Sequence, residues 1–206
     1  GNGSNAVIAV SVNGSPLGVD TSGGTTATAD SGVATFAAAK LLGTTGTYKL
    51  YFSSASTGMA GITLASGDIE LTYGSATTIA LSAGDGQSAT VNTNVSTAPK
   101  VRVTDVSGNP VPGVSVTFAV ASGGGSITGP SQTTATNGYA TVGSWKLGTT
   151  SGTNNNTLTA TSGSLSGSPV TFTASANPDT ATALTMTSPT SATNRATMGT
   201  VTVTAR

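Results

Sequence analysis

The sequence predicts an all-β protein built from β-sandwiches. Short segments alternate apolar and polar residues with a period of two, as in Ala6–Val12, Lys100–Thr104 and Val114–Val120. Val and Thr dominate these segments, and their branched side chains suit a pleated surface. Clusters of turn residues such as SGNPVPG at 107–113 separate the segments. Short strands at regular spacing with turn signals between them favour sandwich folds.

The remaining strands are expected wherever β-branched or aromatic residues alternate between turn clusters. These further runs are Gly46–Phe52, Asp68–Tyr73, Tyr139–Leu147, Thr157–Thr161, Pro169–Ala174 and Thr200–Ala205. Sustained helical periodicity is missing from the sequence. Ala37–Leu42 is the only stretch compatible with a helix, and its flanks read as strand.

The composition excludes several classes of function. The 206 residues contain no His and no Cys, so disulfides, thiolate metal sites and the commonest general base are ruled out. Seven basic and seven acidic residues cancel, which leaves no electrostatic footprint for nucleic acid or for a membrane surface. We therefore expect neither an enzyme nor a cofactor. Charged residues are 7% of the chain, and a surface rich in Thr and Ser is typical of extracellular proteins.

An internal repeat gives the domain organisation. Residues 28–53 align with residues 134–162 through TADSGVAT and TATNGYAT, and then through KLLGTTGT and KLGTTSGT. The offset of about 100 residues is the size of one small sandwich domain. The second copy is preceded by ATTIALS at 76–82 and PKVRVTD at 99–105, whereas the first copy has no such lead-in.

The missing lead-in of the first copy lies at the other end of the chain. ATALTMT at 181–187 matches ATTIALS, and GTVTVTA at 199–205 matches PKVRVTD. Joining Arg206 to Gly1 also restores a Gly-Asn turn between two alternating strands. The chain is therefore predicted to contain one domain split between its two ends.

The repeated pattern resembles bacterial immunoglobulin-like (Ig-like) domains of the invasin/intimin type. The matching residues are Val101–Phe118, Asn137–Thr141 and Gly152–Ala160. The resemblance is clear over about 75–176 and weaker over 180–206 together with 1–74. It implies Ig-like β-sandwiches that occur as tandem repeats in cell-surface stalks, adhesin shafts and filaments.

The predicted domains are 1–74, an Ig-like body lacking its first strands; 75–177, a complete Ig-like domain; and 178–206, donor strands. The donor strands could fold back, enter the next molecule, or continue a longer chain of tandem repeats. The last two alternatives give a head-to-tail row. They predict a structural subunit or repeat of an extracellular filament or cell-surface stalk, whose partners are copies of itself. The alternative is an adhesin module that recognises a surface glycan or protein.

Unpaired strand edges accept strands from other chains, so the split domain predicts the residues that pair between subunits. The expected donor residues are Ala183, Leu184, Met186, Val201 and Val203. The expected acceptor residues lie in Ala6–Val12 and are Val7, Ile8 and Val10.

Other polar residues offer weaker chemical alternatives. Asp105 with Asn109, and Asp85 with Asp179, could join a calcium site at a domain junction or serve as turn residues. Asp68 and Glu70 share one face of a predicted strand, which is read as an ordinary solvent face.

Two further patterns concern a tryptophan and four asparagines. Trp145 lies between Ser144 and Lys146 in an alternating segment, where a sandwich core needs a large side chain. Four N-x-S/T triplets mark possible glycosylation sites, at Asn2, Asn13, Asn94 and Asn155.

Overall fold

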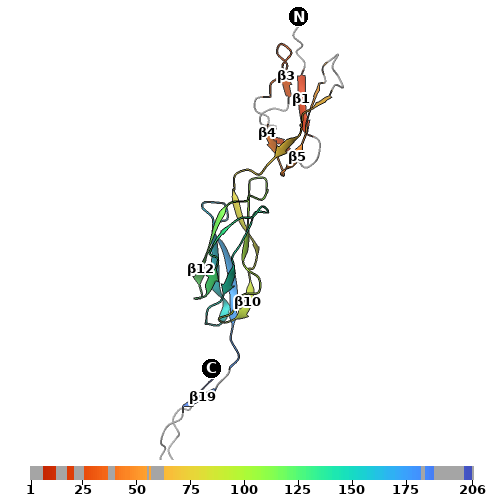
Figure 1. Cartoon of the computed structure of the whole chain (residues 1–206). Coiled ribbons are helices and arrows are strands. Elements are labelled where there is room, and N and C mark those ends of the chain that lie inside the picture. The colour runs from red at the N-terminus through yellow and green to blue at the C-terminus, as the bar shows by residue number, and fades with distance from the viewer. Residues whose placement is uncertain are drawn as a thin grey trace, which may run out of the picture.

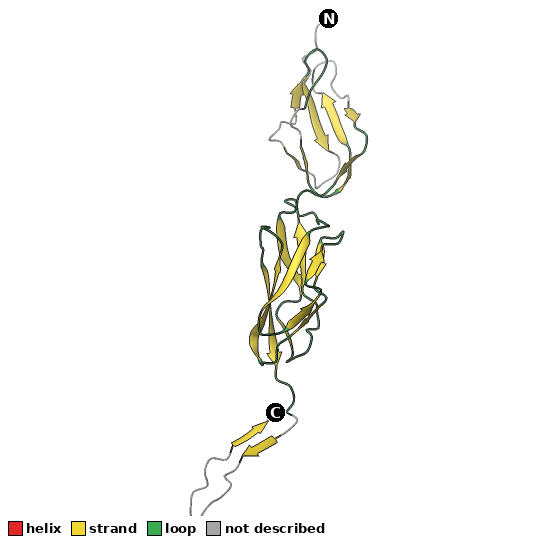
Figure 2. Ribbon diagram, turned by 60° about the vertical axis from the view of Figure 1, so that its left-hand side comes forward, coloured by secondary structure: helices red, strands yellow, loops and turns green. Residues whose placement is uncertain are grey.

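The computed structural model describes residues 7–12, 18–20, 26–36, 40–54, 56, 63–181, 184–187 and 202–205. All regular elements among them are β-strands, which confirms the predicted all-β fold class (Figure 2). Across these described ranges, no helix is long and apolar enough to span a membrane.

Residues 75–177 form one continuous β-sandwich, called here the continuous domain. Its larger sheet has the strand order β10-β18-β17-β12-β14 and its smaller sheet the order β15-β11-β9. The large-sheet strands are β10 (Gln87–Thr90), β12 (Ser115–Ser122), β14 (Ser131–Thr133), β17 (Gly152–Thr161) and β18 (Val170–Asn177). The small-sheet strands are β9 (Thr78–Ala83), β11 (Lys100–Thr104) and β15 (Tyr139–Thr141). A short ladder joins β13 (Ser126–Thr128) to β16 (Ser144–Lys146). Tyr139–Leu147, expected as one run, thus divides between β15 and β16.

The two sheets enclose a well-buried apolar core. Alternate residues of β11, β12, β17 and β18 point inward, as the period-two pattern predicts. Trp145, Phe118 and Phe172 are the largest side chains in this core, each at most 1% exposed. The predicted core position of Trp145 is therefore confirmed. Its indole N–H has no hydrogen-bond partner among the described residues, although a buried indole N–H usually finds one.

The N-terminal body, residues 7–73, contains a single larger sheet with the order β3-β1-β6-β7. Its strands are β1 (Val7–Val12), β3 (Thr26–Thr28), β6 (Leu50–Ser54) and β7 (Thr63–Ala65). Two short ladders accompany it, β2 (Gly18–Asp20) with β4 (Lys40–Leu42) and β5 (Gly46–Tyr48) with β8 (Ile69–Leu71). Ala37–Leu42, the only helix-compatible stretch, thus ends in a strand.

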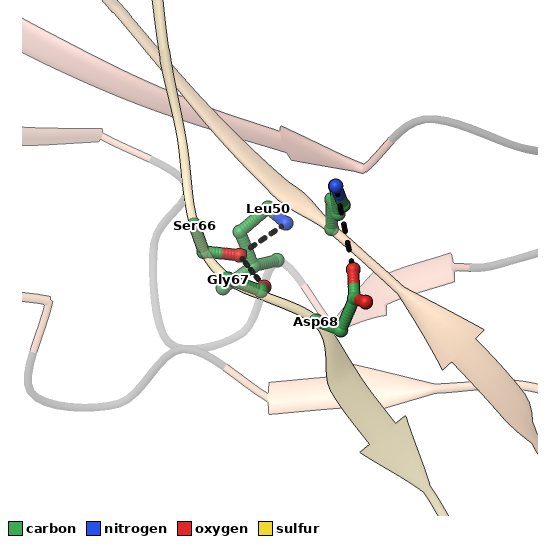
Figure 3. A network of polar contacts seen from close by, with 5 residues as sticks. Leu50, Ser66, Gly67 and Asp68 are labelled. Carbon is green, nitrogen blue, oxygen red and sulfur yellow. Dashed lines mark hydrogen bonds and ion pairs between the residues drawn. The ribbon is translucent and has the colours of Figure 1, made fainter.

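A bend in one hairpin separates β5 from β6, which the sequence suggested as one run. The N–H of Leu50 donates to Ser66 Oγ at 3.0 Å, and Ser66 N–H donates to the Leu50 carbonyl at 2.8 Å. Ser66 Oγ in turn donates to the Gly67 carbonyl at 2.7 Å (Figure 3). The Ser66 side chain thus keeps the backbone bonded where the ladder changes register.

The C-terminal residues form a separate two-stranded ladder, called here the C-terminal hairpin. It consists of β19 (Leu184–Thr187) and β20 (Thr202–Ala205), which run antiparallel. The hairpin lies beyond the end of the continuous domain that is remote from the N-terminal body (Figure 1). Within the described residues, its strands pair only with each other.

Phe172→Ala should destabilise the continuous domain by about 3–5 kcal/mol, because it removes a fully buried ring and leaves a cavity. Urea unfolding followed by the fluorescence of Trp145, the single tryptophan, measures this domain specifically. Val106→Ala is the matched control, since Val106 is 82% exposed and should change stability by less than about 0.5 kcal/mol. Equal effects of the two substitutions would contradict this description of the core.

Candidate assembly strands and domain junction

The largest sheet among the described residues of the N-terminal body corresponds to the larger sheet of the continuous domain. Its order β3-β1-β6-β7 corresponds to β14-β12-β17-β18, and the antiparallel partners correspond strand by strand. The continuous domain covers that sheet with β11 and β9. Counterparts of these two strands do not occur in the described residues of the N-terminal body.

Burial differs sharply between the two bodies. Seventeen apolar residues are buried together in the continuous domain, among them Ile79, Val101 and Val103 from β9 and β11. Among the described residues of the N-terminal body, only Val10 and Ala29 are buried apolar residues. Phe52 aligns with Leu158, which is fully buried. Phe52 itself is only half-buried, and its ring packs on that of Phe36 at an angle of 55°, with the ring centroids 5.7 Å apart.

The C-terminal hairpin resembles β9 and β11 in sequence and, like them, is an antiparallel pair. Its register sets Leu184 opposite Ala205 and Met186 opposite Val203. The corresponding ladder of the continuous domain sets Ile79 opposite Val103. By the sequence alignment the two registers differ by two residues, which keeps the same residues on the same face. Val203 is 59% exposed, whereas its counterpart Val103 is fully buried.

The predicted acceptor residues lie in β1, which is paired along part of each of its edges. Val7, Ile8 and Ala9 pair with β3, and residues from Ile8 to Val12 pair with β6. In this structure β1 is therefore a central strand of its sheet, and a further strand cannot pair with Ile8. The pairing of Val7, Ile8 and Val10 with another copy stays a prediction, and Ile8 already has a partner on both sides.

The predicted donor residues are only partly described. Leu184, Met186 and Val203 lie in the C-terminal hairpin, on the strands that the sequence indicated. Ala183 and Val201 lie outside the described residues. The pairing of these residues with another copy stays a prediction.

Asn109 connects the continuous domain to the N-terminal body through backbone contacts. Its Oδ1 accepts the Thr45 N–H at 3.0 Å, and its Nδ2 donates to the Gly43 carbonyl at 2.8 Å. The side chain is only 5% exposed. One amide thus engages a donor and an acceptor of the same loop, which fixes the orientation of that loop. Sequence reasoning placed Asn109 in a turn and missed this bridging role.

Asp105 holds Asn109 in place and contacts the connection between the two bodies. Its Oδ2 accepts Asn109 Nδ2–H at 3.0 Å and the Gly74 N–H at 2.8 Å. Its Oδ1 accepts the N–H groups of Ser107 and Asn109, each at 2.9 Å. Burial by itself raises the pKa of Asp105, but the hydrogen bonds from Gly74, Asn109 and Ser107 outweigh it and lower the pKa below its ordinary value.

Asp105 and Asn109, suggested as part of a calcium site at the junction, form this hydrogen-bond network instead. All four contacts of Asp105 are N–H donors, so Asp105 and Asn109 form a turn cap. Within the described ranges, no three His, Cys, Asp or Glu residues gather as a metal site would require.

The second suggested calcium pair is not brought together. Asp85 Oδ1 accepts the N–H and the hydroxyl of Thr173, at 2.7 and 3.0 Å. The Thr173 N–H, opposed by partial burial and aided by the Thr173 hydroxyl and the Gly86 N–H, lowers the pKa of Asp85. Asp179 lies six residues beyond Thr173, about 20 Å along an extended chain, and caps the N–H of Thr180.

Asp68, Glu70 and Ser144 lie on strands or loops and make ordinary surface contacts. Asp68 forms an exposed ion pair with Lys49 at 3.4 Å (Figure 3), and Glu70 lies on the exposed face of β8. Exposed pairs of this kind contribute at most about 1 kcal/mol. The hydroxyl groups of Ser144 and Thr128 hydrogen-bond to each other at 2.8 Å.

The four possible glycosylation sites differ in access. Asn94 is exposed. Asn155 is half-buried, and its Nδ2 donates to the Thr150 carbonyl at 2.7 Å, so a glycan on that nitrogen would have to break this bond. Asn2 and Asn13 lie outside the described residues.

Comparison with known proteins adds two distant structural likenesses. No protein-family model matches the chain, and no curated protein matches its sequence. The chain is similar to the D0-D1 domain of Intimin, with 20% identity and a TM-score of 0.33, over 85% of this chain and 79% of that one. It is also similar to domains 4-9 of the surface layer protein SbsC, with 15% identity and a TM-score of 0.38. That match covers 94% of this chain and 26% of the other, so the chain spans about a quarter of the SbsC structure.

Asn109→Ala should loosen the junction, because it removes both bonds to the loop of Gly43 and Thr45. Small-angle scattering of the full chain should show a broader distribution of distances between the two bodies. The continuous domain should lose about 1–3 kcal/mol of stability, because Asp105 loses a donor. Asn94→Ala, at an exposed asparagine, is the control and should change neither measurement. An unchanged scattering profile for Asn109→Ala would contradict the bridging role.

Acidification should destabilise the continuous domain through Asp105. A lowered folded-state pKa contributes stability that is complete above the unfolded pKa of about 3.9 and is lost as pH falls through the folded value. The unfolding free energy, followed by Trp145 fluorescence, should therefore fall as the pH decreases from about 4 to 2. Asp105→Asn should be less stable at pH 7 and show a smaller loss over this window. An equal loss in both proteins would contradict the assignment to Asp105.

Proposed function

We propose that this chain is a structural unit of an extracellular filament or cell-surface stalk. Units join head to tail, either by β-strand complementation between separate chains or by covalent tandem repetition. One observation carries the proposal: the described residues of the N-terminal body include no counterparts of β9 and β11, and two strands of similar sequence pair as a hairpin at the C-terminal end of the chain.

The free energy that β9 and β11 contribute to the continuous domain supports the proposal that the N-terminal body needs two corresponding strands. In the continuous domain, Ile79, Val101 and Val103 are each at most 1% exposed. Burial of a side chain of this size contributes about 1.5–3 kcal/mol, so the three together contribute about 5–9 kcal/mol. That sum is comparable to the whole stability of a typical domain. A sheet without these strands gains strongly from accepting them.

The C-terminal hairpin, in turn, would be stabilised by packing against a sheet. An isolated two-stranded hairpin is at best marginally stable in water, because it has no third strand and no second layer to bury its apolar face. Val203 is more than half exposed there. Docking on a sheet that lacks its cover satisfies both partners.

Chain length argues against folding back within one molecule. The connection from Asn177 to Leu184 spans at most about 25 Å. The ten-residue strand β17 alone is about 30 Å long, and β19 would have to pass the whole continuous domain to reach the N-terminal body. The acceptor is therefore proposed to belong to another copy or to the next repeat. A contact between unlike ends of identical units does not close on itself and produces an open row.

The proposed unit acts mechanically. Main-chain ladders and buried apolar side chains hold each domain, and strand exchange connects neighbouring units. We propose neither catalysis nor a cofactor, and the expected partners are copies of this chain. A surface rich in hydroxyls and poor in charge suits an extracellular location.

Deletion of residues 180–206 should abolish head-to-tail assembly, because it removes both strands of the hairpin. Electron microscopy and light scattering of the purified chain measure assembly, and Trp145 fluorescence checks that the continuous domain still folds. Asn94→Ala, remote from the hairpin in sequence, should assemble like the unmodified chain. Filaments that persist after the deletion would sink the proposal.

The mass of the fully denatured native protein separates the two forms of the proposal. A mass near 19.7 kDa indicates separate subunits joined by donated strands. A mass many times larger indicates a covalent row of repeats, in which the hairpin leads directly into the next N-terminal body. A chain near 19.7 kDa that stays monomeric under native conditions would contradict both forms.

A further inference from the structure

A four-residue motif occurs once in each body and is paired in only one of them. The motif reads Gly-Tyr-Ala-Thr at 138–141 and Gly-Val-Ala-Thr at 32–35. In the continuous domain it forms β15, the edge to which β11 attaches. Arg102 lies opposite Tyr139, and Val101 lies opposite Ala140. The Val103 N–H extends this contact by donating to the Gly138 carbonyl at 2.8 Å.

In the N-terminal body the same motif has an open edge. Gly32 and Gly138 both have positive φ angles, +87° and +75°, so the turn that begins the motif has a similar backbone form. Val33 bridges only Asp30, the other side of its own turn, and is 67% exposed. Ala34 and Thr35 belong to no ladder, and no described residue donates to the Gly32 carbonyl.

We propose that the Gly32–Thr35 edge is the acceptor for strand β20 of a second copy of this chain. If β20 binds this edge in the register that β11 has with β15, Thr202 of the second copy lies opposite Val33. The Val203 N–H then donates to the Gly32 carbonyl, as the Val103 N–H donates to the Gly138 carbonyl. This inference rests on the proposed head-to-tail function and names the contact through which the units join.

Strand β20 has the free edge that this contact requires. Its partner β19 covers one edge, as β9 covers one edge of β11. The opposite edge of β11 is the one that binds β15. On docking, Val203 becomes buried against the sheet of the N-terminal body, as Val103 is buried in the continuous domain. Thr202 stays on the outer face, where its counterpart Arg102 lies with its guanidinium 5.7 Å from the Tyr139 ring centre.

Engineered cysteines test the register directly, because the chain contains no cysteine of its own. Directly opposed antiparallel residues have Cα atoms about 4.5–5.5 Å apart, within the range of a disulfide. The double variant Val33→Cys with Thr202→Cys should form a ladder of covalent multimers when the assembled chain is oxidised. The matched control is Val7→Cys with Thr202→Cys, which places the acceptor cysteine in β1 and should remain uncrosslinked.

The outcomes separate the acceptor site from the proposed function. A ladder from the Val33 variant alone supports the site. If the chain assembles but only the Val7 variant crosslinks, or neither variant does, the acceptor site is overturned and head-to-tail assembly stands. If the unmodified chain does not assemble and no ladder forms, both are overturned. A disulfide confined to monomers would mean that the strand folds back, which also overturns the site.

A second pair of variants tests which face of β20 becomes buried. Val203→Asp should reduce assembly at least tenfold, because it places an unpaired carboxylate against the apolar sheet. Thr202→Asp introduces the same charge one residue away, on the outer face, and should assemble within about twofold of the unmodified chain. Trp145 fluorescence confirms in each case that the continuous domain is folded. Equal loss in both variants would overturn the proposed register.

Discussion

Coverage of one sheet by a second is the constraint on which the rest of this structure depends. A sheet with an apolar face must bury that face against another layer. The continuous domain does so with β9 and β11, of which Ile79, Val101 and Val103 are at most 1% exposed. Among the described residues of the N-terminal body, no counterparts of β9 and β11 cover its larger sheet, and only Val10 and Ala29 are buried apolar residues there.

The junction between the two bodies uses a different interaction, suited to a repeating structure. In the Gly43–Thr45 loop, Asn109 hydrogen-bonds only to backbone groups. Asp105 accepts a hydrogen bond from the backbone N–H of Gly74. Backbone contacts place few demands on the sequence of the neighbouring domain. Because Asp105 and Asn109 are both 5% exposed, their bonds are shielded from competing water and can hold the two bodies in one orientation.

The sequence predicted the strands well because period-two alternation and turn residues are local signals. The core position of Trp145 and the strand at Lys100–Thr104 followed from that pattern alone. The repeat also indicated the strands near the C-terminus, where β19 and β20 lie. Sequence reasoning did not predict that β1 pairs with both β3 and β6, because these partners are distant in sequence. It also missed the bridging contacts of Asn109, which depend on the placement of a second body.

An unpaired strand edge can bind a partner, but it also carries a risk of aggregation, since any exposed strand can pair with an unrelated chain. The edge at Gly32–Thr35 is short and begins at a turn, so ladder bonds alone give a weak contact. Affinity must then come from apolar burial, and the alternation of β20 supplies Val203 on one face and Thr202 on the other. A strand of an unrelated protein would need the same alternation in the same register to gain both the ladder hydrogen bonds and the apolar burial. In the proposed assembly, the repeat itself would provide the specificity, because the strand that fits best is the one whose sequence repeats that of β11 in the continuous domain.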